Sequence, residues 1–421
     1  MIDKGIIKEI LLESRKDVEQ QQLVHREFVF EEFANYVLIG VRRAGKSFLL
    51  YQRMQELLRA GVTWDEMLYI NFEDERLVGM TASDLNLILE VHGMMSDKRP
   101  TLFLDEIQTT EGWEKFARRL ADQKYRVYIT GSNAKMLSSD VATTLGGRYV
   151  VTHVMPYSFK EFLTANGIGY SDEEMSTTVG RAAVQRLFAD YFHFGGFPEG
   201  ALLKAKRDYL SSVYQKIYLG DIAARNNIEN KFALRILFKK IAESVKQPIS
   251  FTRLANIVAS TGAKLSKPTL INYIEYSRDA FLLYPIRNIA DSLTERETNP
   301  KYYFVDNGII SLLAMDVETS LLENLVATEL IRRYGVDDRV FFYNKDKEVD
   351  FYLPDEATAI QVSYNPQQNE ETWKRETEPL LKISKVLDCK KLLLLTYDAE
   401  GHTVIKDREI DVIPAWKWLL Q

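Results

Sequence analysis

The segment Gly40-Val41-Arg42-Arg43-Ala44-Gly45-Lys46-Ser47 follows the pattern G-x-x-x-x-G-K-[ST], which is typical of a loop that cradles nucleotide phosphates. An apolar run at residues 36–39 precedes it, and a stretch with helical character at residues 48–58 follows it. The chemistry requires this strand–loop–helix order. The glycines let backbone N–H groups turn inward around the phosphates, and the helix N-terminus adds the positive end of its dipole.

Each residue of this loop has an expected role. Lys46 is predicted to reach the β- and γ-phosphates, and the Ser47 hydroxyl is predicted to hold Mg²⁺. The predicted cofactor-binding residues are Gly40, Val41, Arg42, Arg43, Ala44, Gly45, Lys46, Ser47 and Phe48.

A second apolar run, PTLFLDE at residues 100–106, ends in two carboxylates. Asp105 is predicted to bind Mg²⁺, directly or through water, and Glu106 to orient and polarise the attacking water. Another strand pattern, residues 67–72, lies between the two segments. A catalytic Glu beside the metal-binding Asp, together with this inserted strand, favours the ATPase division that includes AAA+ proteins over kinases and Ras-like GTPases.

Polar residues at the ends of two further strands are candidates for the reaction. Ser132 and Asn133 follow the strand predicted at residues 125–130, where a polar side chain can lie between the phosphates and the attacking water. The sequence does not choose between the two. Asn71 ends the inserted strand and is a candidate for holding Glu106 idle until a partner binds, although a strand-terminal Asn also commonly caps a turn.

Arg148 follows two glycines and is predicted to act as an arginine finger, supplied either within the chain or from a neighbouring subunit. The alternative is an ordinary solvated loop charge. If Arg148 is counted as an arginine finger, the predicted catalytic residues are Glu106, Asn133 and Arg148.

Composition limits the class of protein. The chain has 421 residues, a net charge of -6 and a single cysteine, Cys389, so it is long enough for two or three domains and has no internal disulfide. No apolar stretch reaches the length of a membrane span, and the N-terminus lacks the apolar core of a signal peptide. We expect a cytoplasmic protein with no membrane partner. The mildly acidic charge argues against strong nonspecific duplex binding over the whole surface but permits a local basic patch.

The expected fold class is α/β, beginning with an AAA+ type parallel sheet. Residues 1–22 are predicted to form an N-terminal helical segment, 23–160 the P-loop ATPase core, and 161–228 a helical lid. Residues 229–310 resemble a winged helix, in which a third helix near residues 270–281 takes the recognition position.

Four side chains of that winged helix are candidates for contacts with the phosphates of double-stranded DNA. They are Lys264, Lys267, Asn272 and Arg278. The alternative is that this module packs against its own chain, with Tyr273 and Ile274 in the core.

Residues 311–421 show the element succession of a restriction-endonuclease-like domain. Active members carry an acidic residue on the first helix, then D…(D/E)-x-K, and the acidic groups hold Mg²⁺ against the scissile phosphate. Glu323 or Glu329 and Asp350 match the first two positions, but Gln361-Val362-Ser363 stands at the third. We therefore predict a nuclease fold without nuclease activity. The alternative is that Lys345 or Lys347 takes the role of the missing lysine.

Taken together, the chain resembles bacterial and archaeal AAA+ ATPases in which a P-loop module precedes a winged helix and a restriction-endonuclease-like domain of unknown function. The motifs that carry the resemblance are GVRRAGKS (40–47), YINFEDERL (69–77), LFLDEIQ (102–108), ITGSNA (129–134), GGR (146–148), MPYSFKEFL (155–163), FGGFPE (194–199), YFVDNGI (303–309) and KEVDFYL (347–353). The resemblance implies binding of ATP and its hydrolysis. Relatives often show Glu-x-Lys where this chain has Gln361 and Ser363.

Three functions follow as hypotheses. The first is an Mg²⁺-dependent ATPase that acts as a switch or motor on a partner, which can be DNA, another protein or a second copy of the chain. The second is a nucleotide-gated DNA-binding or scaffold protein with little turnover. The third is a metal-dependent nuclease, against which the residues at 361 and 363 argue.

Overall fold

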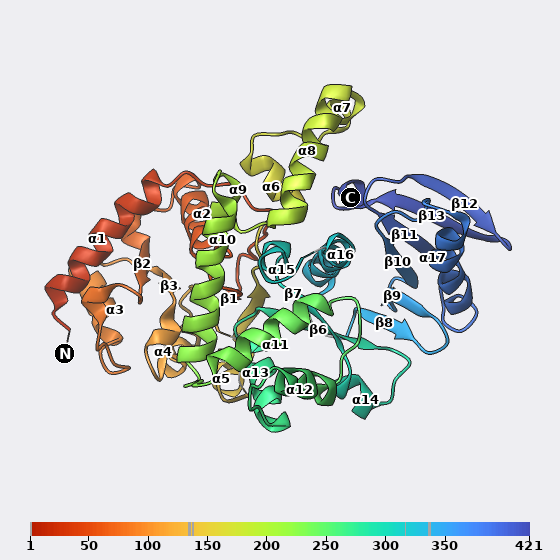
Figure 1. The fold of residues 1–421 in the computed structure, drawn as a ribbon. Coiled ribbons are helices and arrows are strands. Elements are labelled where there is room, and N and C mark those ends of the chain that lie inside the picture. Colours follow the sequence, from red (N-terminus) through yellow and green to blue (C-terminus); the bar gives the residue numbers. More distant parts are fainter. Residues whose placement is uncertain (1, 134–135, 137–138, 316, 336–337) are drawn as a thin grey trace. The chain divides into compact units, whose positions relative to one another are not determined.

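Five parallel strands form the first sheet, in the order β2-β3-β4-β1-β5. This computed structural model describes residues 2–133, 136, 139–315, 317–335 and 338–421 (Figure 1). The chain divides into two units, Met1–Met155 with Asp279–Phe281, and Pro156–Arg278 with Leu282–Gln421. The first sheet belongs to the first unit.

The elements of the first unit alternate between strand and helix. They are α1 (Lys4–Gln20), β1 (Asn35–Ile39), α2 (Lys46–Arg59), β2 (Met67–Asn71), α3 (Asn86–Met95), β3 (Thr101–Asp105), α4 (Trp113–Asp122), β4 (Val127–Gly131), α5 (Ser139–Leu145) and β5 (Tyr149–His153), with 3-10 turns at Trp64–Glu66, Glu75–Leu77 and Ile107–Thr109. Strands β1, β2, β3 and β4 are buried almost throughout, as expected of a parallel sheet that helices cover on both faces. The prediction of a mixed α/β fold with a parallel sheet is confirmed.

The N-terminal helix α1 packs on this sheet. Its buried residues recur at helical spacing, at Ile7, Ile10, Leu11, Ser14 and Val18, and they face β2, α2 and α3. Its first turn is capped by the Asp3 carboxylate, which accepts a hydrogen bond from the backbone N–H of Gly5.

The second unit contains a second, mixed sheet of eight strands, in the order β12-β13-β11-β10-β9-β8-β6-β7. Its strands are β6 (Leu283–Asn288), β7 (Lys301–Phe304), β8 (Phe341–Asn344), β9 (Glu348–Leu353), β10 (Thr358–Ser363), β11 (Lys391–Thr396), β12 (Gly401–Ile405) and β13 (Arg408–Pro414). Helix α17 packs on β9, β10 and β11, over a core that includes Val349, Leu380 and Leu394 (Figure 1).

Helices make up the rest of the second unit. They are α6 (Phe159–Ala165), α7 (Asp172–Ser176), α8 (Thr178–Phe194), α9 (Pro198–Ala201), α10 (Lys206–Gln215), a π-helix at Lys216–Ala224, α11 (Lys231–Glu243), α12 (Phe251–Ser260), α13 (Lys267–Asp279), α14 (Leu293–Thr298), α15 (Asn307–Leu313), α16 (Glu318–Tyr334), α17 (Glu370–Ile383) and α18 (Ala415–Trp418). No helix among the described residues has both the length and the apolar character needed to span a bilayer.

The boundary predicted at residue 310, between the winged helix and the C-terminal domain, falls inside a continuous sheet. Strands β6 and β7 fall within the residues expected to form the winged helix, and they pair with each other in antiparallel register. However, β6 also pairs in parallel with β8, through Arg287 opposite Phe341 and Asn288 opposite Phe342. Strands on both sides of residue 310 therefore share one sheet. The reason is non-local pairing across about 50 residues, which no local pattern announces.

Candidate functional site

The loop after β1 takes a conformation that depends on glycine. Gly40 has φ +151°, and a Cβ atom at this position would lie 2.1 Å from the carbonyl oxygen of Val154. Gly45 has φ +92° and is the N-cap of α2. Both backbone angles are disfavoured for residues with side chains, so these glycines allow the chain to turn sharply between strand and helix. The loop thus leads into the N-terminus of α2, where Lys46 and Ser47 are the first two residues.

The Lys46 side chain points back into its own loop. Its ammonium donates to the carbonyl oxygens of Gly40 and Val41, each at 3.1 Å, and lies 3.6 Å from Oε1 of Glu106. The residue is only 4% exposed. A buried ammonium needs acceptors for its three protons, and here two loop carbonyls and the carboxylate from the end of β3 supply them.

Asp105, the last residue of β3, is held by hydroxyl groups. Tyr69 donates to its Oδ2 at 2.7 Å, and Thr130 donates to its Oδ1. Burial and the neighbouring Glu106 raise the pKa of Asp105, although the hydrogen bonds from Thr130, Ser47 and Tyr69 oppose that rise. The structure therefore brings together Ser47 and Asp105, the two residues predicted to bind Mg²⁺. A hydroxyl and a carboxylate oxygen are ligands of the kind Mg²⁺ prefers.

Glu106 lies beside Lys46 in a strained backbone conformation, with φ +53°. Its backbone N–H donates to Oγ1 of Thr130 at 2.9 Å, which fixes the turn after β3. Burial acts to raise the pKa of its carboxyl, but the Lys46 ammonium and the Gln108 amide outweigh burial, so the pKa lies below its usual value. The carboxylate is therefore ionised near neutral pH, as a water-activating base must be.

Gln108 is a site residue that the sequence reasoning missed. It lies in the 3-10 turn Ile107–Thr109, and its Nε2 donates to Oε2 of Glu106. The role of holding Glu106 was predicted for Asn71 instead. In the structure Asn71 forms a turn, because its Oδ1 accepts from the backbone N–H of Glu73 at 2.9 Å. No sequence signal marks Gln108, because a glutamine two residues after a carboxylate has no distinctive spacing.

Three other supporting residues were also missed. Tyr69 and Thr130 hold Asp105, and both lie on strands next to β3. Arg26 is buried, and its guanidinium donates to the carbonyls of Ala44 at 3.0 Å and Met155 at 2.9 Å. It thereby ties the loop to the segment after β5. No motif marks Arg26, since its partners are 18 and 129 residues away.

Both sensor candidates lie at the same edge of the sheet as the loop. Ser132 and Asn133 directly follow β4 and are buried. The Ser132 hydroxyl also contributes to lowering the pKa of Glu106. Ala134, the last residue of the ITGSNA motif, lies outside the described residues.

Arg148 lies at the opposite edge of the sheet. The parallel register pairs Tyr149 with Asn35 and His153 with Ile39, so Arg148 precedes the start of β5 while the loop follows the end of β1. Five residues at about 3.3 Å each separate the two edges by roughly 15 Å. The Arg148 guanidinium bonds to Asp122 at the end of α4. Within one chain, therefore, Arg148 is not beside Lys46. Of the two alternatives for an arginine finger, this position disfavours one supplied within the same chain.

The residues predicted for nuclease chemistry are arranged differently from the expected pattern. Glu323 and Asp350 both contact a lysine, but it is Lys301, the first residue of β7. Lys345 is exposed, and Lys347 instead pairs with Glu378 at 3.6 Å, so neither takes the role proposed for it. Glu329 pairs with Arg332 and Arg333.

Helix α13, predicted to contact DNA, buries one face. Leu270, Tyr273, Ile274 and Ser277 are buried, which fits the alternative that Tyr273 and Ile274 belong to the core. Lys264, Lys267 and Asn272 are exposed, whereas Arg278 is paired with Glu275 at 2.7 Å.

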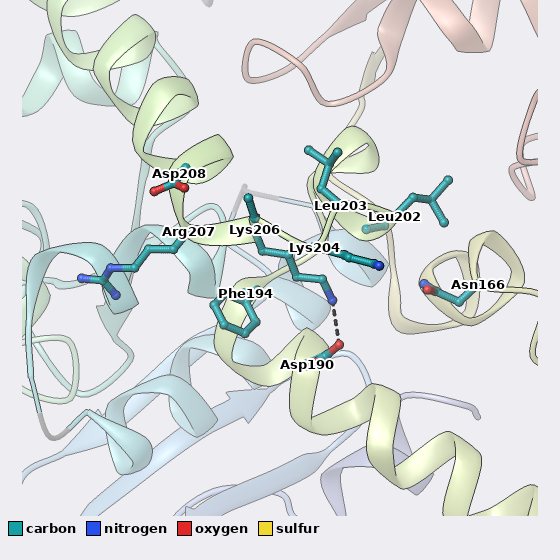
Figure 2. A pocket seen from close by; sticks show the side chains of 11 residues that line it. Asn166, Asp190, Phe194, Leu202, Leu203, Lys204, Lys206, Arg207 and Asp208 are labelled. Carbon is teal, nitrogen blue, oxygen red and sulfur yellow. Dashed lines mark hydrogen bonds and ion pairs between the residues drawn. The ribbon is translucent and has the colours of Figure 1, made fainter.

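A separate hollow lies in the second unit, between the end of α8 and the segment that leads into α10 (Figure 2). Its volume is about 510 Å³, and its lining includes Lys204, Lys206 and Arg207. Lys206 is paired with Asp190 at 2.7 Å, which is the dashed contact in Figure 2. None of the residues predicted for nucleotide chemistry lines it.

Comparison with known families and solved structures gives two kinds of match. The family described as AAA domain matches residues 32–163, and a family described as a domain of unknown function matches residues 185–320. Among solved structures, a Walker-type ATPase of Pyrococcus abyssi is 15% identical, with 74% of this chain and 96% of that chain covered and a TM-score of 0.40. Cdc6p of Pyrobaculum aerophilum is 14% identical, with coverages of 75% and 95% and a TM-score of 0.25.

Two curated relatives match over most of their length. An uncharacterised protein of Methanocaldococcus jannaschii is 33% identical over 436 residues, which covers 100% of this chain and 96% of the relative. One of Haemophilus influenzae is 33% identical over 397 residues, covering 91% and 94%. The chain therefore belongs to the same family as these two proteins, and its residues 32–163 form a segment that matches the AAA domain family.

Proposed function

We propose that this chain binds ATP together with Mg²⁺ and hydrolyses it at the carboxyl edge of the first sheet. One observation carries the proposal: where β1 and β3 end, Lys46 contacts Glu106 and Ser47 contacts Asp105. Ligands of open parallel sheets bind at this edge, outside the carboxyl ends of the strands.

The roles follow from the chemistry of each group. The Lys46 ammonium, now satisfied by two carbonyls and a carboxylate, would exchange those acceptors for phosphate oxygens. Ser47 and Asp105 would hold Mg²⁺, which neutralises charge on the phosphates. Glu106 would accept a proton from the attacking water, and Asn133 or Ser132 would position that water.

The test is phosphate release from ATP by the purified full-length chain. Glu106→Gln is expected to lower kcat by at least about a hundredfold, since a positioned general base contributes 10² to 10⁴. Lys46→Ala is expected to abolish nucleotide binding as well, because it removes the ammonium that meets the phosphates. The matched control is Glu111→Gln, an exposed carboxylate nearby. Unchanged turnover in the Glu106 variant would remove that residue from the mechanism.

As a second candidate we propose that the exposed side of the α13 region binds double-stranded DNA. Lys264, Lys267 and Asn272 are exposed there, while the opposite side of α13 is buried. Lysine contacts with phosphates carry no sequence information and weaken steeply with salt.

Gel shifts with duplex DNA at several salt concentrations test this second candidate. The double variant Lys264→Ala/Lys267→Ala is expected to weaken binding and to make it less dependent on salt. Lys8→Ala/Lys16→Ala, which removes two exposed charges from α1, is the matched control. Equal loss of binding in both double variants would argue for a nonspecific charge effect.

A further inference from the structure

The second unit contains a fully buried lysine whose ammonium contacts three carboxylates. Lys301 is 0% exposed. Its Nζ lies 2.7 Å from Oε1 of Glu348, 3.0 Å from Oε1 of Glu323 and 3.4 Å from Oδ1 of Asp350. An ammonium has three N–H donors, so these three contacts use its full hydrogen-bonding capacity.

The surrounding residues fix the carboxylates in place. Tyr303, two residues along β7 from Lys301, donates to Oε1 of Glu323 at 2.8 Å. The backbone N–H of Val362 on β10 donates to Oδ2 of Asp350 at 2.9 Å. Two elements, α16 and β9, supply the carboxylate oxygens, and groups on β7 and β10 hold them around one point, which is occupied by the Lys301 nitrogen.

The charges in this cluster are not balanced one to one. A single ammonium faces three carboxyl groups, whereas a divalent cation would balance them more fully. Carboxylate oxygens that converge on one point, here from two elements, are also the ligand set that Mg²⁺ and Mn²⁺ take. Next to Val362, the Oε1 atom of Gln361 is buried and accepts no hydrogen bond from any residue that the structure describes.

A divalent cation does not fit the cluster as it stands. The ammonium already uses one oxygen of each carboxylate, and two cations within about 3 Å of each other repel strongly at any internal dielectric. Over the described ranges, no group of three or more His, Cys, Asp and Glu side chains is arranged to hold a metal ion.

We infer that the Lys301 ammonium stands in the place of a divalent cation, and that removing it opens a metal site formed by Glu323, Glu348 and Asp350. This inference does not depend on nucleotide chemistry, because Lys301 and the residues around Lys46 lie in different units. It would also add a physical reason, beyond the residues at 361 and 363, to the sequence-based prediction that residues 311–421 form a nuclease fold without nuclease activity.

The experiment measures Mn²⁺ binding to the full-length chain without nucleotide, by isothermal titration calorimetry. The wild type supplies the baseline for any ion bound elsewhere. Lys301→Ser, which leaves room for an ion, is expected to bind about one Mn²⁺ per chain more than the wild type. Lys301→Arg, which keeps the positive charge, is the matched control and is expected to bind no more than the wild type. Adding Glu323→Gln to Lys301→Ser should remove the extra ion.

Where Lys301→Ser folds, two results would overturn the inference. One is a folded Lys301→Ser variant that binds no more Mn²⁺ than the wild type. The other is a wild type whose own Mn²⁺ binding is lost on Glu323→Gln, since the site would then already hold a metal beside the lysine. If Lys301→Ser does not fold alone, millimolar Mn²⁺ is expected to restore folding where KCl of equal ionic strength does not. Absence of that rescue would also overturn the inference.

Discussion

At the scale of single residues, the site is built from strained and buried groups that support one another. Glu106 has a positive φ, and this conformation costs about 1 kcal/mol or more for a residue with a side chain. The contacts to Lys46, Gln108 and Thr130 hold it there. The sequence identified Glu106 and Lys46 because their motif is local. It did not identify Gln108, because a glutamine two residues from a carboxylate has no distinctive spacing.

Gln108 is predicted to act as a positioning residue through Glu106. Gln108→Leu is expected to lower kcat for ATP hydrolysis by about tenfold and to leave KM for ATP unchanged, because the amide contacts the carboxylate and not Lys46. The amide also helps to keep the pKa of Glu106 low. Its loss should therefore raise that pKa and move the acid limb of the pH–rate profile to higher pH.

The matched control for Gln108→Leu is Gln123→Leu, at an exposed glutamine at the end of α4. Measurements of phosphate release from pH 5 to 9 separate the fall in kcat from the shift of the pH–rate profile. A fall in kcat with an unshifted pH profile would show that Gln108 acts on the fold of the loop and not on the carboxylate.

At the scale of elements, local patterns predicted single strands and helices well, whereas partners far apart in the chain were not foreseen. The run before the loop is β1, and the following helix is α2, at Lys46–Arg59. In contrast, β6 is joined to β8, and Lys301 on β7 reaches residues 22 and 49 positions away. Strand pairing and buried ion clusters depend on the whole sheet, so a pattern confined to one segment contains no information about them.

The N-cap of α15 provides a prediction about pH. Asp306 accepts hydrogen bonds from the backbone N–H groups of Gly196 at 2.7 Å and Gly308 at 2.8 Å. Burial nevertheless raises the pKa of Asp306 to about 6. The folded state therefore binds this proton more tightly than the unfolded state, whose Asp pKa is about 3.9. The contribution of Asp306 to stability is thus largest below about pH 4 and falls as the pH rises to about 6.

Comparison with Asp306→Asn isolates this titration. The variant loses an acceptor and is expected to be less stable at every pH, because an amide N–H₂ then faces a backbone N–H. Its deficit in the free energy of unfolding should be smaller at pH 7 than at pH 4 by roughly 2 kcal/mol, since one pKa unit corresponds to about 1.4 kcal/mol and the unfolded-state carboxyl is already partly ionised at pH 4. Urea unfolding at both pH values measures the deficit, and an equal deficit would contradict the raised pKa.

At the scale of the whole molecule, the residues predicted for ATP hydrolysis all lie in the first unit. Arg148 differs from the others because it lies at the opposite edge of the first sheet. Its guanidinium is paired with Asp122 and lies at the edge of the sheet away from Lys46. An arginine that contributes to hydrolysis from this place must therefore serve the nucleotide of another chain. In GTPases, an arginine supplied by a partner chain stabilises charge on the transferring phosphate.

We therefore predict that hydrolysis depends on association between copies of the chain. The specific activity of the wild type is expected to rise with protein concentration, and Arg148→Ala should lower kcat without weakening ATP binding.

Glu106→Gln keeps Arg148 but lacks the base, whereas Arg148→Ala keeps the base. A mixture of these two variants should hydrolyse ATP faster than the sum of their separate rates, because mixed assemblies pair an intact Glu106 with an intact Arg148. Lys124→Ala, an exposed cation that follows α4, is the matched control. Wild-type activity in Arg148→Ala at every concentration would leave Arg148 as a partner of Asp122 alone.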